Sequence, residues 1–147
     1  NIDNMAEDIM TSDYFEDIEQ AKEVIQNNIE VLNNMGDIIK VYRAISVNFN
    51  PNEFINYLKN TNKPLGVYWA DNYSSAKPYD GKGNYTYVLE ALVNKTNIDF
   101  ERSIYTRSLY PENEIRLEIG SNIKLNNVYY NNKPLEINLI KNKQFKV

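Results

Sequence analysis

The stretch "PENEIRLEIGSNIKL", from Pro111 to Leu125, decides how the second half of this 147-residue chain is interpreted. Glu112 and Glu114 flank one asparagine, and a short run of alternating apolar residues lies on each side of the glycine that follows. This alternation predicts two strands, over 114–119 and 123–130. The two glutamates are then either an acidic entrance to an ordinary strand or two carboxylates placed for chemistry.

Composition narrows the kinds of site the chain can build. It contains no cysteine and no histidine. Disulfides, thiolate metal sites, a cysteine nucleophile, a Ser-His-Asp triad and the usual zinc sites are therefore excluded. The formal net charge is −4, whereas nucleic-acid binding needs a basic face, and no apolar run is long enough to span a bilayer. We expect no metal, no nucleic acid and no membrane, and chemistry that uses carboxylates, arginine, lysine, hydroxyls or a bound cofactor.

The first part of the chain, residues 1–36, is predicted to be helical. Apolar residues recur at helical spacing between Ile18 and Leu32, after a capping-box pattern formed by Asp13 and Glu16. A shorter helix is expected before it.

Residues 38–147 are predicted to be mostly β, with one embedded helix. That helix should start with Asn50 as its cap, Pro51 at its first position and Glu53 reaching back. Helices followed by a run of strands indicate an α+β fold, here a single domain over 1–147. A loop is expected over 101–113, and strands over 38–47, 65–70, 85–93, 114–119, 123–130 and 135–140.

Three of these strands carry polar residues that packing alone does not require. Arg43 interrupts the apolar strand "VYRAIS", and "GVYWADNYSSA" gathers aromatic residues behind Gly66 and a polar turn. The third is the E-x-E of Glu112 and Glu114. In this order the motifs resemble the mono-ADP-ribosyltransferase family, and the likeness to phage and prophage ADP-ribosyltransferase-like domains covers roughly residues 38–130.

The resemblance implies N-terminal helices packed on a mainly antiparallel two-sheet β core, with NAD as substrate and no metal. It implies transfer of ADP-ribose to a target protein, with E-x-E hinting at arginine as the acceptor. We expect a soluble monomer of the phage or toxin-effector type that acts in a host cytoplasm.

The resemblance also implies roles for individual residues. Glu114 would stabilise the positive charge that develops on the ribose, Glu112 would orient the incoming nucleophile, and Arg43 would bind the phosphates of NAD. Because residues i and i+2 of a strand point to one face, both glutamates would reach one cleft if the strand extends back to Glu112. Tyr105 and Tyr110, on the loop before the E-x-E, would meet the target protein. The NAD site would be formed by Arg43, Ala44, Gly66, Tyr68, Trp69, Ser74 and Tyr79.

The middle strand departs from the family pattern. Arginine-modifying members usually carry Ser-Thr-Ser there, and another branch carries a histidine on the first strand, whereas this chain has Trp69-Ala70-Asp71 and no histidine. Two alternatives therefore stand beside the transferase: an NAD glycohydrolase, and an inactive domain that only grips a partner. Structural roles also stand as alternatives, an ion pair for Arg43 and core packing for Trp69 among them.

Overall fold

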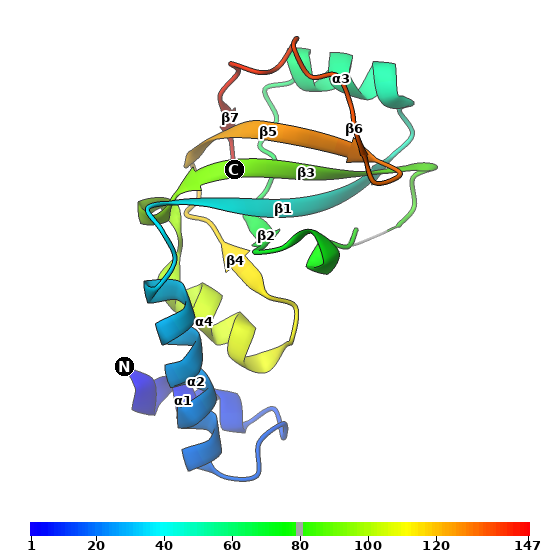
Figure 1. The fold of residues 1–147 in the computed structure, drawn as a ribbon. Coiled ribbons are helices and arrows are strands. Elements are labelled where there is room, and N and C mark those ends of the chain that lie inside the picture. The colour runs from blue at the N-terminus through cyan, green and yellow to red at the C-terminus, as the bar shows by residue number, and fades with distance from the viewer. Residues whose placement is uncertain (79–80) are drawn as a thin grey trace.

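A computed structural model describes residues 1–78 and 81–147, which form an α+β fold built on one sheet (Figure 1). The strands lie in the order β4-β2-β1-β3-β5-β6, and β7 also pairs with β5. Every pairing between the described strands is antiparallel. The elements are α1 (Ile2–Met10), α2 (Ile18–Asn33), β1 (Ile38–Val47), α3 (Pro51–Asn60), β2 (Tyr68–Ala70), the 3₁₀ turn η1 (Tyr73–Ser75), β3 (Tyr85–Asn94), the 3₁₀ turn η2 (Lys95–Asn97), α4 (Phe100–Leu109), β4 (Glu114–Arg116), β5 (Asn122–Tyr130), β6 (Lys133–Pro134) and β7 (Phe145–Lys146).

The expected α+β class is confirmed, but the described strands form one connected sheet instead of two. The reason is the central position of β1. It pairs along its whole length with β3 on one side, and on the other side Tyr42 pairs with Ala70 of β2. The short strands of the E-x-E side are thereby joined to the long strands of the same sheet.

Local capping explains where two of the helices begin. Asn50 and Glu53 form the predicted capping box of α3, each side chain bonding the other's backbone N–H at 3.0 Å. The cap expected at Asp13 for α2 is wrong. Asp17 caps this helix, because its carboxylate accepts from the N–H of Gln20 at 2.8 Å, whereas Asp13 has a left-handed φ of 62° before the helix.

The segment expected to be a loop before the E-x-E is mostly the helix α4. Asp99 caps it by accepting from the N–H of Arg102. Its buried face consists of Ser103, Ile104 and Ser108, so two of the three inward positions are polar. The apolar periodicity that normally reveals a helix is therefore missing from its sequence.

The predicted strands over 114–119 and 135–140 are also corrected. β4 ends at Arg116, and Ile119 is 85% exposed on the turn that follows. None of residues 135–140 forms a strand. The short strand β6 (Lys133–Pro134) comes just before them, and the chain then runs through turns to β7. Lys143 explains that path, because its ammonium donates to three carbonyls at the end of α3, those of Leu58, Lys59 and Thr61.

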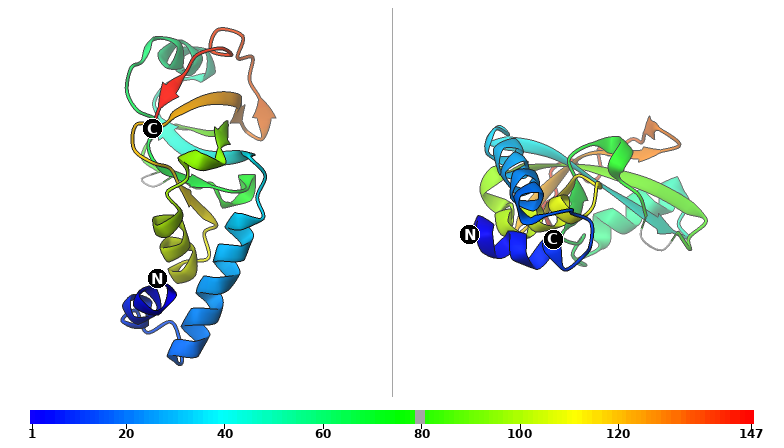
Figure 2. Two further views of the ribbon diagram at one scale, coloured as in Figure 1. Left: turned by 90° about the vertical axis from the view of Figure 1, so that its left-hand side faces the viewer. Right: turned by 90° about the horizontal axis from the view of Figure 1, so that it is seen from below.

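The helices lie at two ends of the molecule (Figure 2). α1, α2 and α4 gather beside the edge strand β4, and α3 lies at the opposite end near β5. One core of buried apolar side chains runs through both groups, from Ile9 and Ile25 in the helices to Leu89 and Val128 in the sheet. Among the described residues, no helix is long and apolar enough to cross a membrane.

Candidate active site

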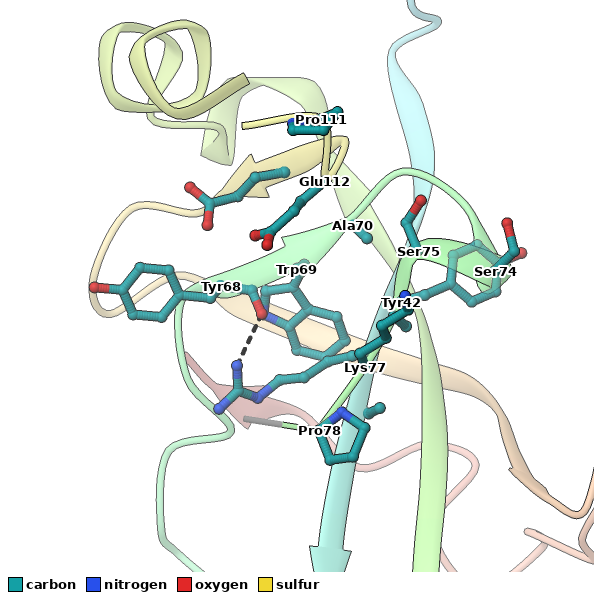
Figure 3. Close-up of a pocket in the computed structure, with 14 residues that line it drawn as sticks. Tyr42, Tyr68, Trp69, Ala70, Ser74, Ser75, Lys77, Pro78, Pro111 and Glu112 are labelled. Carbon is teal, nitrogen blue, oxygen red and sulfur yellow. Dashed lines mark hydrogen bonds between the residues drawn. The ribbon is translucent and has the colours of Figure 1, made fainter. Parts of the chain in front are cut away.

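A cavity of roughly 330 Å³ opens between β1, β2, the segment that follows β2 and the loop that leads into β4 (Figure 3). It brings together residues from the three stretches that the sequence analysis singled out. Seven of the predicted site residues line it: Arg43, Ala44, Tyr68, Trp69, Ser74, Glu112 and Glu114.

The strand register aligns Glu114 of β4 with a residue of β1. Tyr42 of β1 is opposite Ala70 of β2, and Ala70 is opposite Glu114 of β4. Residues that pair directly across neighbouring strands point to the same face of a sheet. The three side chains therefore form one row across three strands, and all three line the cavity.

Glu114 is a buried carboxylate that is poorly satisfied. The residue is 7% exposed, and its buried Oε2 has no hydrogen-bond partner. Arg116 Nε lies 3.9 Å from Oε2, which is too long for a hydrogen bond. Burial raises the pKa of Glu114 above 4.5, opposed by a hydrogen bond from Thr106 and by the charge of Arg116, while Glu112 raises it further. Most buried polar atoms in proteins have partners, so this oxygen calls for an explanation.

Glu112 reaches the cavity by a different route from the one expected. Strand geometry does not extend back to it, because β4 begins at Glu114 and Asn113 between them has a left-handed φ of 54°. Asn113 is held in that turn, since its side chain donates to Ser75 Oγ and its carbonyl accepts from the N–H of Asp71. Both glutamates line the cavity, but Glu112 is exposed whereas Glu114 is buried.

Arg43 is held against the backbone that leads into β2. Its Nη1 donates to the carbonyl of Tyr68 at 2.8 Å, the bond drawn as a dashed line in Figure 3. A Cβ atom on Gly66 would lie 3.0 Å from the guanidinium carbon of Arg43. Gly66 also has a φ of 101°, a backbone conformation that residues with a side chain rarely adopt. Gly66 does not line the cavity. Because it has no side chain, it lets the guanidinium of Arg43 lie close to the backbone at this point.

The aromatic residues of β2 have separate roles. Trp69 is 3% exposed and donates from Nε1 to the carbonyl of Gly66 at 2.8 Å, so it is a core residue that also forms a wall of the cavity. Tyr68 is 39% exposed at the rim, with the guanidinium of Arg116 4.2 Å from the centre of its ring. Ser74 lies in η1, where its hydroxyl donates to Asn72 Oδ1.

Two predicted residues of the described chain lie outside this arrangement. Tyr105 is on α4, Tyr110 caps the end of that helix, and both are exposed away from the lining of the cavity. Tyr110 meets Tyr14 edge-on, with ring centres 6.3 Å apart. Tyr79 is outside the described residues.

Several residues that line the cavity were not predicted from the sequence. Tyr42, Ser75 and Lys77 line the cavity (Figure 3). Burial and a hydrogen bond to Glu90 raise the pKa of the Tyr42 hydroxyl to about 12, so it stays protonated at neutral pH. Only the pairing of β1 with β2 reveals which face of "VYR" meets the cavity, and Lys77 has no sequence signal beyond its charge.

Glu90 is a second buried carboxylate, on the far side of Tyr42 in the same cross-strand row. Burial alone would raise its pKa, but hydrogen bonds from Asn127, Asn126 and Tyr42 outweigh burial and lower it. Tyr129 also donates to its Oε2. Its charge inside the apolar run "VLEALV" was a signal in the sequence. A carboxylate so fully bonded supports Tyr42, whereas Glu114 is open to a further partner.

The described part of the chain contains no cluster of three or more acidic side chains arranged to hold a metal ion. Comparisons with protein-family models, with curated proteins and with solved structures found no match to this chain.

Proposed function

We propose that this protein is an NAD-dependent mono-ADP-ribosyltransferase that modifies a target protein. The observation that carries the proposal is the buried carboxylate of Glu114, whose Oε2 accepts no hydrogen bond, on a cavity that Arg43 also lines. An ionised carboxylate taken out of water costs free energy unless charges or hydrogen bonds compensate it. A ligand whose reaction develops positive charge beside Glu114 would supply that compensation.

The proposed reaction breaks the bond between nicotinamide and ribose. Nicotinamide leaves with the bonding electrons, positive charge develops on the ribose, and a nucleophile of the target forms the new bond at the same carbon and loses a proton. A fixed carboxylate stabilises that charge more in the transition state than in the bound substrate. This is the role of Glu114.

The other lining residues suit the rest of the substrate. Arg43 carries a permanent planar cation that matches phosphate oxygens, and Tyr68 and Trp69 offer flat surfaces for nicotinamide. Glu112 is exposed at the rim, where an acceptor from another protein has access. Its charge would attract and orient a guanidinium acceptor.

A domain that binds NAD without transferring ADP-ribose is the second candidate. The observation in its favour is Ala70, which lies opposite Glu114 on the middle strand and offers no hydroxyl to it. Such a domain would bind NAD but release no nicotinamide.

Two glutamine substitutions test the proposal, with labelled NAD and host-cell lysates as the source of acceptor. Glu114→Gln should lower both nicotinamide release and protein labelling by about 10²–10³-fold, the usual effect of removing one transition-state stabiliser. Glu112→Gln should stop labelling while slow NAD hydrolysis continues. Glu118→Gln, on the exposed turn after β4, is the matched control and should leave both rates unchanged.

The outcomes separate the candidates. Full activity in Glu114→Gln contradicts the transferase. NAD binding without any nicotinamide release supports the binding domain, and nicotinamide release without labelling of any protein supports a glycohydrolase. Equal loss of both products in the two variants contradicts the division of work between the glutamates.

A further inference from the structure

Arg116 contacts two of the residues that line the cavity, Glu114 and Tyr68. It is on β4 directly opposite Tyr68, and its side chain is 17% exposed. Two residues after Glu114 on the same strand, it points to the same face as that carboxylate. It does not line the cavity itself.

The guanidinium of Arg116 lies between two groups that do line the cavity. Its Nε is 3.9 Å from Glu114 Oε2, and its Cζ is 4.2 Å from the centre of the Tyr68 ring. Both the Nε and the Oε2 are buried and without a hydrogen bond. The charges are therefore paired through space, and the flat guanidinium rests on the aromatic ring as in a cation–π contact.

The backbone of Arg116 is fixed from the other side by the start of α4. Its N–H donates to Ser103 Oγ at 2.8 Å, and its carbonyl accepts from the N–H of Asp99 at 2.8 Å and from Ser103 Oγ at 3.3 Å. Ser103 is fully buried. A side chain that starts from so rigid a backbone can hold its neighbours in place.

We propose that Arg116 is a positioning residue, which holds the Glu114 carboxylate and the Tyr68 ring in place and supplies the counter-charge of that carboxylate. Its part in catalysis rests on the proposed function, whereas its effect on Glu114 does not.

The other charged groups around Glu114 do not replace Arg116. Arg107 of α4 bonds the Glu114 backbone carbonyl, but its charge is already paired with Asp71 at 2.8 Å. Glu112 carries the same charge as Glu114 and raises its pKa, while Thr106 contributes only a hydroxyl. The guanidinium of Arg43 is turned to the carbonyl of Tyr68, and Lys77 lies exposed on the segment after η1.

The test is a carboxyl-carbon NMR titration of the free protein with labelled glutamate, the Glu114 signal being assigned by its loss in Glu114→Gln. An opposite charge within about 4–6 Å typically lowers the pKa of a carboxyl by about 1–3. Arg116→Gln should therefore raise the Glu114 midpoint by about 1–3 pH units. Arg116→Lys, which keeps the charge, should return the midpoint most of the way. Arg102→Gln, on the exposed face of α4, should leave it unchanged.

A second variant keeps the test decisive if Arg116→Gln fails to fold. Tyr68→Leu leaves Arg116 intact but removes the ring that its guanidinium rests on. If the ring positions the guanidinium, the Glu114 midpoint rises in this variant too. An unchanged midpoint in Arg116→Gln, or in Tyr68→Leu where the first variant does not fold, overturns the proposal.

Nicotinamide release adds a readout that a purely structural role would not change. In Arg116→Gln the acid limb of the rate profile should move to higher pH together with the NMR midpoint, and Arg116→Lys should restore it. An acid limb that stays in place while the midpoint moves overturns the catalytic part of the proposal. A shifted midpoint in a protein without NAD activity supports the electrostatic role of Arg116 and contradicts the proposed function alone.

Discussion

Glu114 holds its carboxylate where water solvates it poorly, and this has a consequence for stability. Its folded pKa lies above 4.5, so the folded protein binds the proton more tightly than the unfolded chain. The protonated form therefore stabilises the fold at low pH. That contribution is lost as pH rises through 4.5 and is gone above the folded pKa.

Glu114→Gln should therefore stabilise the protein at pH 7, by on the order of 1 kcal/mol, while removing activity. A neutral amide of similar shape is less costly to bury than a carboxylate. The advantage should shrink as pH falls through the raised folded pKa towards 4.5, because the carboxyl of the folded natural protein becomes protonated over that range. Urea denaturation at pH 4 and pH 7 measures this difference. A variant less stable than the natural protein at pH 7 would show that the charge of Glu114 is well compensated.

Sequence motifs could predict those members of the site that lie on their own short stretch. Arg43, Trp69 and Glu114 were found because a cation, an indole and a carboxylate pair stood out from apolar strands. Arg116 was not predicted, because the role we propose for it depends on which residue lies opposite it on β2. Strand register of that kind is set by tertiary pairing between distant segments, which one sequence does not reveal.

At the scale of elements, prediction succeeded where the signal is local. The α3 helix has cap, proline and returning glutamate within four residues, and the structure has all three. The prediction for α4 failed because its inward face is largely serine and carries no apolar pattern. Ser103 bonds the backbone of β4, and Ser108 accepts from the side-chain amide of Asn28 on α2. A helix that packs through polar side chains lacks the 3.6-residue apolar repeat by which a helix is predicted from its sequence.

The segment entering β2 positions Arg43 of β1, and Gly66→Ala tests that coupling. The added methyl group strains the backbone, because Gly66 has a positive φ of 101°, and it would lie 3.0 Å from the guanidinium carbon of Arg43. Gly120→Ala is the matched control, since Gly120 has a φ of 84° and open space around its Cβ position. Both variants should lose about 1–2 kcal/mol of unfolding free energy from backbone strain.

Only Gly66→Ala should also weaken NAD binding. The measurement is the quenching by NAD of the fluorescence of Trp69, the single tryptophan of the chain. The reason is that only this variant displaces Arg43. Equal NAD affinity in the two variants would show that the position of Arg43 does not matter for binding.

At the scale of the whole molecule, Arg107 links the helical end to the sheet. Its side chain is 7% exposed and pairs with Asp71 beyond β2 at 2.8 Å. It also donates to the Glu114 carbonyl and to Asn28 of α2, each at 3.4 Å. One residue thus ties α2 and α4 to the strands that form the cavity. The shared apolar core and this link predict a single unfolding transition in the natural protein.

Arg107→Met should weaken that cooperativity, because it removes the link and leaves Asp71 without its counter-charge. Breaking a buried pair costs about 3–5 kcal/mol, and the partial exposure of Asp71 places the expected loss at the low end of that range or below it. Far-UV circular dichroism follows mainly the helices, and Trp69 fluorescence follows the sheet. In the variant the helical signal should be lost at a lower urea concentration than the fluorescence signal, whereas the two coincide in the natural protein. Arg102→Met, on the exposed face of the same helix, should behave like the natural protein. Coincident transitions in Arg107→Met would show that the apolar core alone joins the helices to the sheet, and that the cavity does not depend on this arginine for its support.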